Sequence, residues 1–256
     1  MAEWQSGLFA LPPGVDFAAE FVRGFLDRMS GQPPEAVARV TIYANSGRTL
    51  TAMQDAFDRH GPLLLPTLRV VTDLGAGPAA AHGPLAAPLA RRLELARLID
   101  GLLRQRPDLA AGHSVPALAH SLADLMTEMQ TEGCGPDALY SIDTGDHARH
   151  WQNALEFLRI AADFHLTGVP VDRAARQRIA AQTAAADWAR GLNLPVDPVI
   201  VAGSTGSHGA TRLFMQALAG LPNGAVVLPG FDAGQPQDVW AVSYTHLRAH
   251  ETSLHL

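Results

Sequence analysis

The sequence predicts an α/β fold with a parallel sheet that a long helical segment interrupts. Short apolar runs at 8–11, 40–44 and 68–72 behave like buried strands, and a polar turn and an amphipathic helix follow the first two. Strand–turn–helix units in series favour parallel strands with helices packed on the faces of the sheet. The pattern then becomes mainly helical and resumes near residue 199. We therefore expect one α/β domain that is interrupted by a helical insertion and completed after it.

The first two units explain the beginning of the predicted sheet. After the strand at 8–11, a Pro-Pro-Gly turn leads to Asp16, a suitable N-cap for a helix with one apolar face. After the strand at 40–44, the turn Asn45-Ser46-Gly47 leads to a helix with Leu50, Met53 and Phe57 on its buried face. The third strand, at 68–72, ends this part.

The predicted insertion begins with a linker rich in Gly, Pro and Ala. Four amphipathic helices follow, marked by Leu89 to Leu102, by a helix capped at Ser114, by Trp151 to Ala162, and by a helix from about Asp172. We expect a domain organisation of four segments. These are 1–75 (sheet domain, first part), 76–195 (helical insertion), 196–241 (sheet domain, resumed) and 242–256.

The last segment, "VSYTHLRAHETSLHL", continues none of these patterns. It resembles translated sequencing-adapter read-through, so we exclude 242–256 from the fold argument. The expectation is that the natural protein continues beyond Ala241 and that this chain is an N-terminal fragment.

Composition excludes several kinds of chemistry. The 19 basic residues are all arginines, so the P-loop lysine, a Schiff-base lysine and a lysine general base are impossible. The net charge of -6 argues against independent nucleic-acid binding, and the single cysteine, Cys134, cannot form an internal disulfide. No apolar run is as long as a membrane span, and we expect a cytoplasmic protein with no membrane partner.

Three interpretations compete for the glycine turn in "VIVAGSTGSHGATRLFMQAL", residues 199–218. A P-loop is excluded because no Gly-Lys-Ser/Thr follows the glycines. A dinucleotide-binding turn remains possible, since Gly203, Gly206 and Gly209 follow a strand and Asp232 ends the next one. The third interpretation is a structural turn, with Ser204 or Thr205 capping the following helix.

A metal site is a further hypothesis. His147 and His150 are three residues apart, with Asp143 and Asp146 nearby, and a solvated helix start explains the same residues.

Several blocks taken in order resemble one family. They include "LFALPPGVDF", "RVTIYANSGRTLTAMQDAF", "LLLPTLRVVTDL", "RRLELARLI", "LADLMTEMQTEG", "HWQNALEFLRIA" and "PVIVAGSTGSHGATRLFMQALAGLPNGAVVLPGFD". Up to about Asp238, the chain resembles the N-terminal region of the AddB family in its alphaproteobacterial form. AddB is the B subunit of the AddAB helicase–nuclease, which processes double-strand DNA breaks.

The resemblance implies a RecA-like, superfamily-1 helicase-like parallel sheet interrupted by an all-helical subdomain. It also implies that catalysis has been lost from this part. Pro13, Gly14, Val15 and Asp16 stand at the place of the phosphate loop without Gly-Lys-Thr. Ala202 and Gly203 stand at the place of the Walker-B carboxylates, where they cannot ligate a metal. We therefore expect no catalytic residue, no metal and no cofactor in this fragment.

The remaining role that the resemblance implies is scaffolding and guidance of single-stranded DNA beside the AddA motor subunit. Turns at the carboxyl ends of such strands face the DNA or the nucleotide. The candidate DNA-binding residues are Asn45, Ser46, Arg48, Ser204 and Thr205, although a helix cap and a surface arginine explain the first three equally well. Family members carry an iron–sulfur cluster and use Mg²⁺ in a C-terminal nuclease domain, and their DNA partners include single strands and duplex ends.

Overall fold

A computed structural model describes residues 6–76, 85, 87–110, 112–135, 137–140, 158–159 and 172–232 of the chain. The chain divides into two compact units, one of Met1–Gly75 with Ile179–Leu256 and one of Ala76–Arg178. We call them the sheet unit and the helical unit. The segment 242–256 lies outside the described residues.

The sheet unit contains five parallel strands, which confirms the predicted α/β class. The strands are β1 (Gly7–Ala10), β2 (Thr41–Ala44), β3 (Thr67–Val70), β4 (Val199–Ala202) and β5 (Gly224–Leu228). Their order in the sheet is β1-β5-β4-β2-β3. β4 therefore pairs with β2, with Thr41 opposite Val199, and with β5, with Val199 opposite Gly224.

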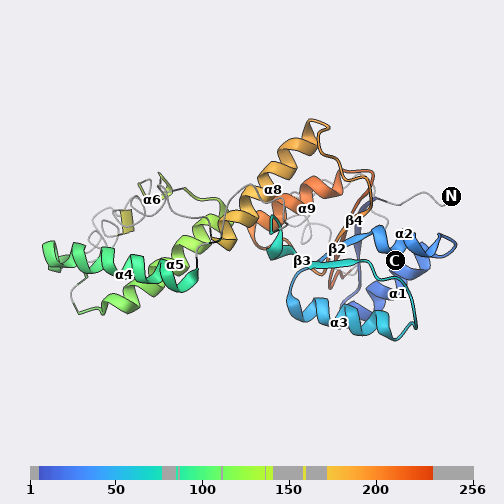
Figure 1. Ribbon diagram of the computed structural model, residues 1–256, viewed down its shortest axis with the longest axis horizontal. Helices are drawn as coiled ribbons and strands as arrows, with labels where there is room; N and C mark the ends of the chain where they lie inside the picture. The colour runs from blue at the N-terminus through green and yellow to red at the C-terminus, as the bar shows by residue number, and fades with distance from the viewer. Residues whose placement is uncertain are drawn as a thin grey trace. The chain divides into compact units, whose positions relative to one another are not determined.

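One face of the sheet, here the first face, is covered by α1 (Phe17–Met29), α2 (Pro34–Arg39) and α3 (Gly47–Asp58) (Figure 1). Phe21 and Phe25 stack along α1 with ring centroids 6.2 Å apart, and Phe57 of α3 meets Phe25 edge-on at 5.9 Å. These rings pack on alternate residues of the strands, among them Ile42, Ala44, Ile200, Ala202 and Val227. The alternation is that of a sheet with both faces buried.

The second face is covered by α9 (Gly209–Ala219) and by the C-terminal part of α8 (Arg173–Ala189) (Figure 1). Phe214 of α9 lies between Tyr43 and Trp188, with ring centroids 5.5 Å and 5.6 Å away. The sequence placed the end of the insertion at residue 195. The units instead separate after Arg178, because the following turns of α8 pack Ala181 and Trp188 on the sheet.

Side-chain caps that the sequence signals stand at the starts of α1 and α3 in the sheet unit. The carboxylate of Asp16 accepts a hydrogen bond from the Ala19 backbone N–H at 3.1 Å, which confirms the predicted cap of α1. The Ser46 hydroxyl accepts from the Thr49 N–H at 3.2 Å in the same way. The predicted strand at 68–72 ends earlier, because Val71–Asp73 turns into a 3-10 helix.

The helical unit contains two packed helices, α4 (Pro88–Gln105) and α5 (Val115–Glu132), and the short helix α6 (Asp137–Tyr140). A small core of Leu95, Ile99, Leu122 and Met126 joins the pair. Ser114 caps α5 as predicted, accepting from the Ala117 N–H at 3.4 Å. The helix expected around Trp151 lies outside the described residues. In the part of the chain that is described, no helix has both the length and the apolar character needed to cross a membrane.

We predict that Phe214→Ala destabilises the sheet unit by about 3–5 kcal/mol, the usual cost of emptying a buried aromatic site. Phe214 is only 2% exposed and contacts two other rings. Urea denaturation measures the change, with Leu64→Ala as a control because Leu64 is 50% exposed. The control should stay within about 0.5 kcal/mol of the parent protein. A loss below about 1 kcal/mol for Phe214→Ala would contradict this packing.

Candidate functional site at the carboxyl edge of the sheet

The connections that follow β4 and β2 diverge at the carboxyl edge of the sheet. After β2 the chain turns to α3 on the first face, whereas after β4 it turns to α9 on the second face. The two strands are neighbours, so this is the point where the winding of the sheet reverses. Ligands of open α/β sheets bind outside the strand ends at such a point. The turns 45–46 and 203–208 follow these two strand ends.

The β4–α9 turn is shaped by two glycines. Gly203 and Gly206 have φ angles of 78° and 70°, in the left-handed region that favours glycine. Between them, the hydroxyl of buried Ser204 accepts a hydrogen bond from the Gly206 backbone N–H at 3.2 Å. This contact uses Ser204 within the turn itself, while the Thr205 side chain is exposed.

The predicted capping of α9 by Ser204 or Thr205 is wrong. The N-cap is His208, whose side chain makes no capping hydrogen bond. Gly206 and Ser207 lengthen the turn, so both predicted residues stand too far before Gly209 to reach the first N–H groups of the helix. The start of α9 therefore carries the partial positive charge of a helix N-terminus without a side-chain cap.

The β2–α3 turn contributes two exposed polar side chains, Asn45 and Arg48. Ser46 is committed to the helix, because its hydroxyl caps α3 and lies 3.0 Å from the Thr49 hydroxyl. Arg48 is the second residue of α3 and follows directly on this turn. The structure thus brings Asn45 and Arg48 to the same sheet edge as Thr205.

The β1–α1 turn holds the residues expected at the place of a phosphate loop. Pro13, Gly14, Val15 and Asp16 are all exposed, and Gly14 has a φ of 81°. The Asp16 carboxylate caps α1, and its negative charge would repel a phosphate. Backbone hydrogen bonds from Leu11 to Leu228 and from Phe231 to Leu11, 2.9 Å and 2.8 Å long, fasten the turn to the end of β5.

An aromatic ring links this turn to the end of β4. A Cβ added at Gly203 would lie 3.0 Å from Cε1 of Phe17, the first residue of α1. Since β5 separates β1 from β4, the ring bridges a gap of about 10 Å between strand ends. A carboxylate side chain at Gly203 would meet this ring, and Ala202 is fully buried. The residues at this edge therefore do not fit a Mg²⁺–triphosphate centre of the RecA type.

This edge of the sheet can supply hydrogen-bond donors, but it has few charges. Its side-chain donors are the exposed hydroxyl and amide of Thr205 and Asn45, and the Arg48 guanidinium. The N–H groups of the left-handed glycines are already used, because Gly203 donates to the Val227 carbonyl at 3.0 Å and Gly206 donates to the Ser204 hydroxyl at 3.2 Å. Among the described residues, no group of three or more His, Cys, Asp and Glu side chains could hold a metal ion. The predicted pairs His147/His150 and Asp143/Asp146 lie outside those residues. This arrangement suits the recognition of an anion or a polar chain.

Phe17 and His208 are site residues that the sequence did not indicate. In the sequence, Phe17 has the spacing of an ordinary core residue of α1. Its close approach to Gly203 is visible only in the structure. The assignment of His208 depends on how many residues the turn contains before α9, which the glycine spacing leaves open.

The comparisons with known proteins add no assignment. A scan against protein-family models finds no match, and no curated protein matches the sequence.

We predict that Gly203→Ala and Gly206→Ala differ in their effect on stability. Both place a side chain at positive φ, which costs about 1–2 kcal/mol. Only Gly203→Ala also forces a close approach to Phe17, because the nearest contacts at Gly206 are an ordinary 3.6 Å. Gly203→Ala should therefore cost at least about 1 kcal/mol more in urea denaturation.

A double-mutant cycle with Phe17→Ala provides the control. In the Phe17→Ala background, the excess cost of Gly203→Ala should disappear, while the cost of Gly206→Ala should be unchanged. Equal costs for the two glycine substitutions in the parent protein would show that Phe17 does not restrict position 203.

Proposed function

We propose that this chain is the N-terminal, inactivated helicase-like part of an AddB-family subunit, which acts as a scaffold and guides single-stranded DNA beside AddA. The observation that carries the proposal is the interruption of a five-stranded parallel sheet between β3 and β4 by a separate helical unit. A RecA-like domain with an inserted helical subdomain has this order of parts. The family resemblance of the sequence blocks supports the same assignment.

The chemistry of the sheet edge supports an inactive role. ATP hydrolysis requires a cation for the phosphates and carboxylates for Mg²⁺. The turn after β1 has no cation and its one carboxylate, Asp16, caps α1, while the turn after β4 has no carboxylate. The Phe17 ring against Gly203 gives an apolar contact at the place where those carboxylates would lie. In this proposal, AddA supplies the motor, and the sheet unit supplies a surface.

The sheet edge at the carboxyl ends of β2 and β4 is the proposed contact with single-stranded DNA. Asn45, Arg48 and Thr205 are exposed there, and they suit contacts to phosphate rather than to base edges. The net charge of -6 restricts this function to a complex, since one arginine and a few neutral donors give little affinity alone.

We predict that Arg48→Ala weakens DNA binding equally for all sequences in a complex reconstituted with AddA. Loss of one phosphate contact on a single strand should reduce the slope of log K against log salt by about 0.7. Fluorescence anisotropy at several salt concentrations measures both quantities. Arg59→Ala is the matched control, because Arg59 is exposed at the opposite end of α3.

An unchanged affinity and slope for Arg48→Ala would contradict the DNA contact. Equal effects of the Arg48 and Arg59 substitutions would show that the loss of affinity comes from the change in net charge and not from a contact at Arg48. A loss confined to certain sequences would replace the phosphate contact with base recognition at this turn.

A second candidate function is the binding of a dinucleotide at the glycine turn. The observation that favours it is the pair of left-handed glycines before α9, whose N-terminus lacks a side-chain cap. Asp232 follows the neighbouring strand β5, where a carboxylate could contact a ribose.

Thermal unfolding separates the two candidates. If the sheet unit is helicase-like, millimolar NAD or NADP should leave the melting temperature unchanged, because only a ligand in excess of its Kd stabilises the native state. A rise that Gly206→Asp abolishes would establish the dinucleotide site instead. Asp adopts positive φ more readily than most residues, so this variant should still fold, which circular dichroism checks.

A further inference from the structure

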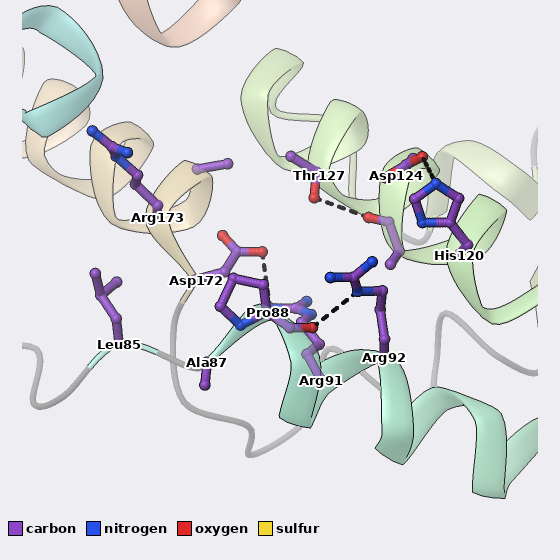
Figure 2. A pocket seen from close by; sticks show the side chains of 12 residues that line it. Leu85, Ala87, Pro88, Arg91, Arg92, His120, Asp124, Thr127, Asp172 and Arg173 are labelled. Carbon is purple, nitrogen blue, oxygen red and sulfur yellow. Dashed lines mark hydrogen bonds and ion pairs between the residues drawn. The ribbon is translucent and has the colours of Figure 1, made fainter. Parts of the chain in front are cut away.

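The helical unit contains a groove between α4, α5 and the first turn of α8, with a volume of about 570 Å³ (Figure 2). This volume is within the usual range for small-ligand sites. The side chains around it are Leu85, Ala87, Pro88, Arg91, Arg92, His120, Ala123, Asp124, Thr127, Asp172, Arg173 and Ala174.

One wall of the groove is fixed by a buried ion pair. Arg91 Nη1 lies 2.8 Å from Asp172 Oδ2, and the two side chains are 8% and 15% exposed. Asp172 also caps α8 by accepting from the Ala175 N–H at 2.7 Å. When the Gln130 amide is oriented with its nitrogen toward Asp172, it donates to the same carboxylate at 2.7 Å. Asp172 therefore contacts residues of α4, α5 and the first turn of α8 at the same time.

Burial lowers the pKa of Arg91, and the carboxylates of Asp172 and Glu94 oppose this change. An arginine remains protonated under such a shift. The charges of the two buried partners thus offset each other, and the pair serves as a fixed wall of the groove.

Arg92 supplies a second cation, which points between α4 and α5 in Figure 2. Its Nε donates to the Pro88 carbonyl at 3.4 Å, and among the described residues it has no carboxylate partner. Of the two aspartates of the groove, Asp172 forms the ion pair with Arg91, and Asp124 Oδ2 lies 3.6 Å from His120 Nε2 on the same helix. The N-terminus of α4 opens beside Arg92 with no side-chain cap at Ala87, which adds partial positive charge.

The rest of the groove is aliphatic. Leu85, Pro88, Ala123 and Ala174 provide apolar surface, and the groove has no Phe, Tyr or Trp side chain on which a nucleobase could stack, while its one imidazole, that of His120, lies 3.6 Å from Asp124. Binding of single-stranded nucleic acid normally depends on such stacking. The groove therefore suits an anion whose body is aliphatic.

We propose that this groove binds a carboxylate on an aliphatic body, with the carboxylate at Arg92 and the start of α4, and the body against Leu85, Ala123 and Ala174. A small branched carboxylic acid and the C-terminus of a peptide that ends in an aliphatic residue share this chemistry. Helix N-termini with a neighbouring arginine recognise carboxylates through directed N–H groups.

Calorimetric titration of the full chain with two probes tests the proposal. The probes are 4-methylpentanoate and a pentapeptide ending in leucine. The first is compared with 4-methylpentanamide, and the second with the same peptide carrying a C-terminal amide. We expect a carboxylate probe to bind and its amide to bind about tenfold more weakly, as for loss of a charge-assisted hydrogen bond. Binding of the peptide alone identifies a peptide C-terminus as the ligand, and binding of the small acid alone identifies a metabolite.

Substitutions in the groove measure the contribution of the Arg92 cation to binding separately from that of the aliphatic surface. Arg92→Gln should weaken the carboxylate probe about tenfold. Ala174→Leu, which fills the groove without changing its charge, should also weaken binding. Arg104→Gln is the matched control on α4, because Arg104 pairs with Asp100 outside the groove.

Three results would overturn the proposal. The first is that neither carboxylate probe binds at millimolar concentration. The second is that a carboxylate probe and its amide bind equally well, and the third is that Arg92→Gln and Arg104→Gln weaken binding equally. Circular dichroism and thermal unfolding establish that each variant is folded before its titration is interpreted.

Discussion

The backbone pairing of β4 with β2 and β5 is the constraint on which the sheet unit depends. The chain leaves the sheet after β3 and returns only at β4, which must then satisfy its backbone groups on both sides. Because this register is fixed, the turn that follows β4 stands beside Asn45 and Arg48. The same register brings Gly203 against Phe17. The composition of the candidate site follows from the pairing of one short strand.

The edge of the sheet combines a ligand-binding shape with little charge. The helix that follows the glycine turn has no side-chain cap, and the partial positive charge of its N-terminus favours anions. The surrounding side chains are mainly neutral, and an aromatic ring lies between the ends of β1 and β4. Such a surface suits weak contacts with a chain that a partner holds in place. The distinct groove of the helical unit has the opposite character, since a rigid ion pair and a further arginine border an aliphatic surface.

Local features of the structure could be predicted from the sequence, whereas long-range contacts could not. Apolar periodicity located the helices that carry Phe21, Phe57 and Phe214, and side-chain chemistry identified the caps Asp16 and Ser114. These signals work because each arises within one helical turn. Strand order depends on contacts between distant segments, so the register of β4 could not be predicted from the sequence. The role of Asp172 was equally hidden, because its partners Arg91 and Gln130 lie on other helices.

The interrupted sheet has a consequence for the order of folding. Thr41 and Val199 pair although they are 158 positions apart, so closing this contact early would sacrifice much chain entropy. The α4–α5 pair joins residues that are close in sequence and can form sooner. Its formation shortens the effective loop between β3 and β4. The helical unit would then act during folding as an internal brace, and the last event would be the entry of β4 into a gap between β2 and β5.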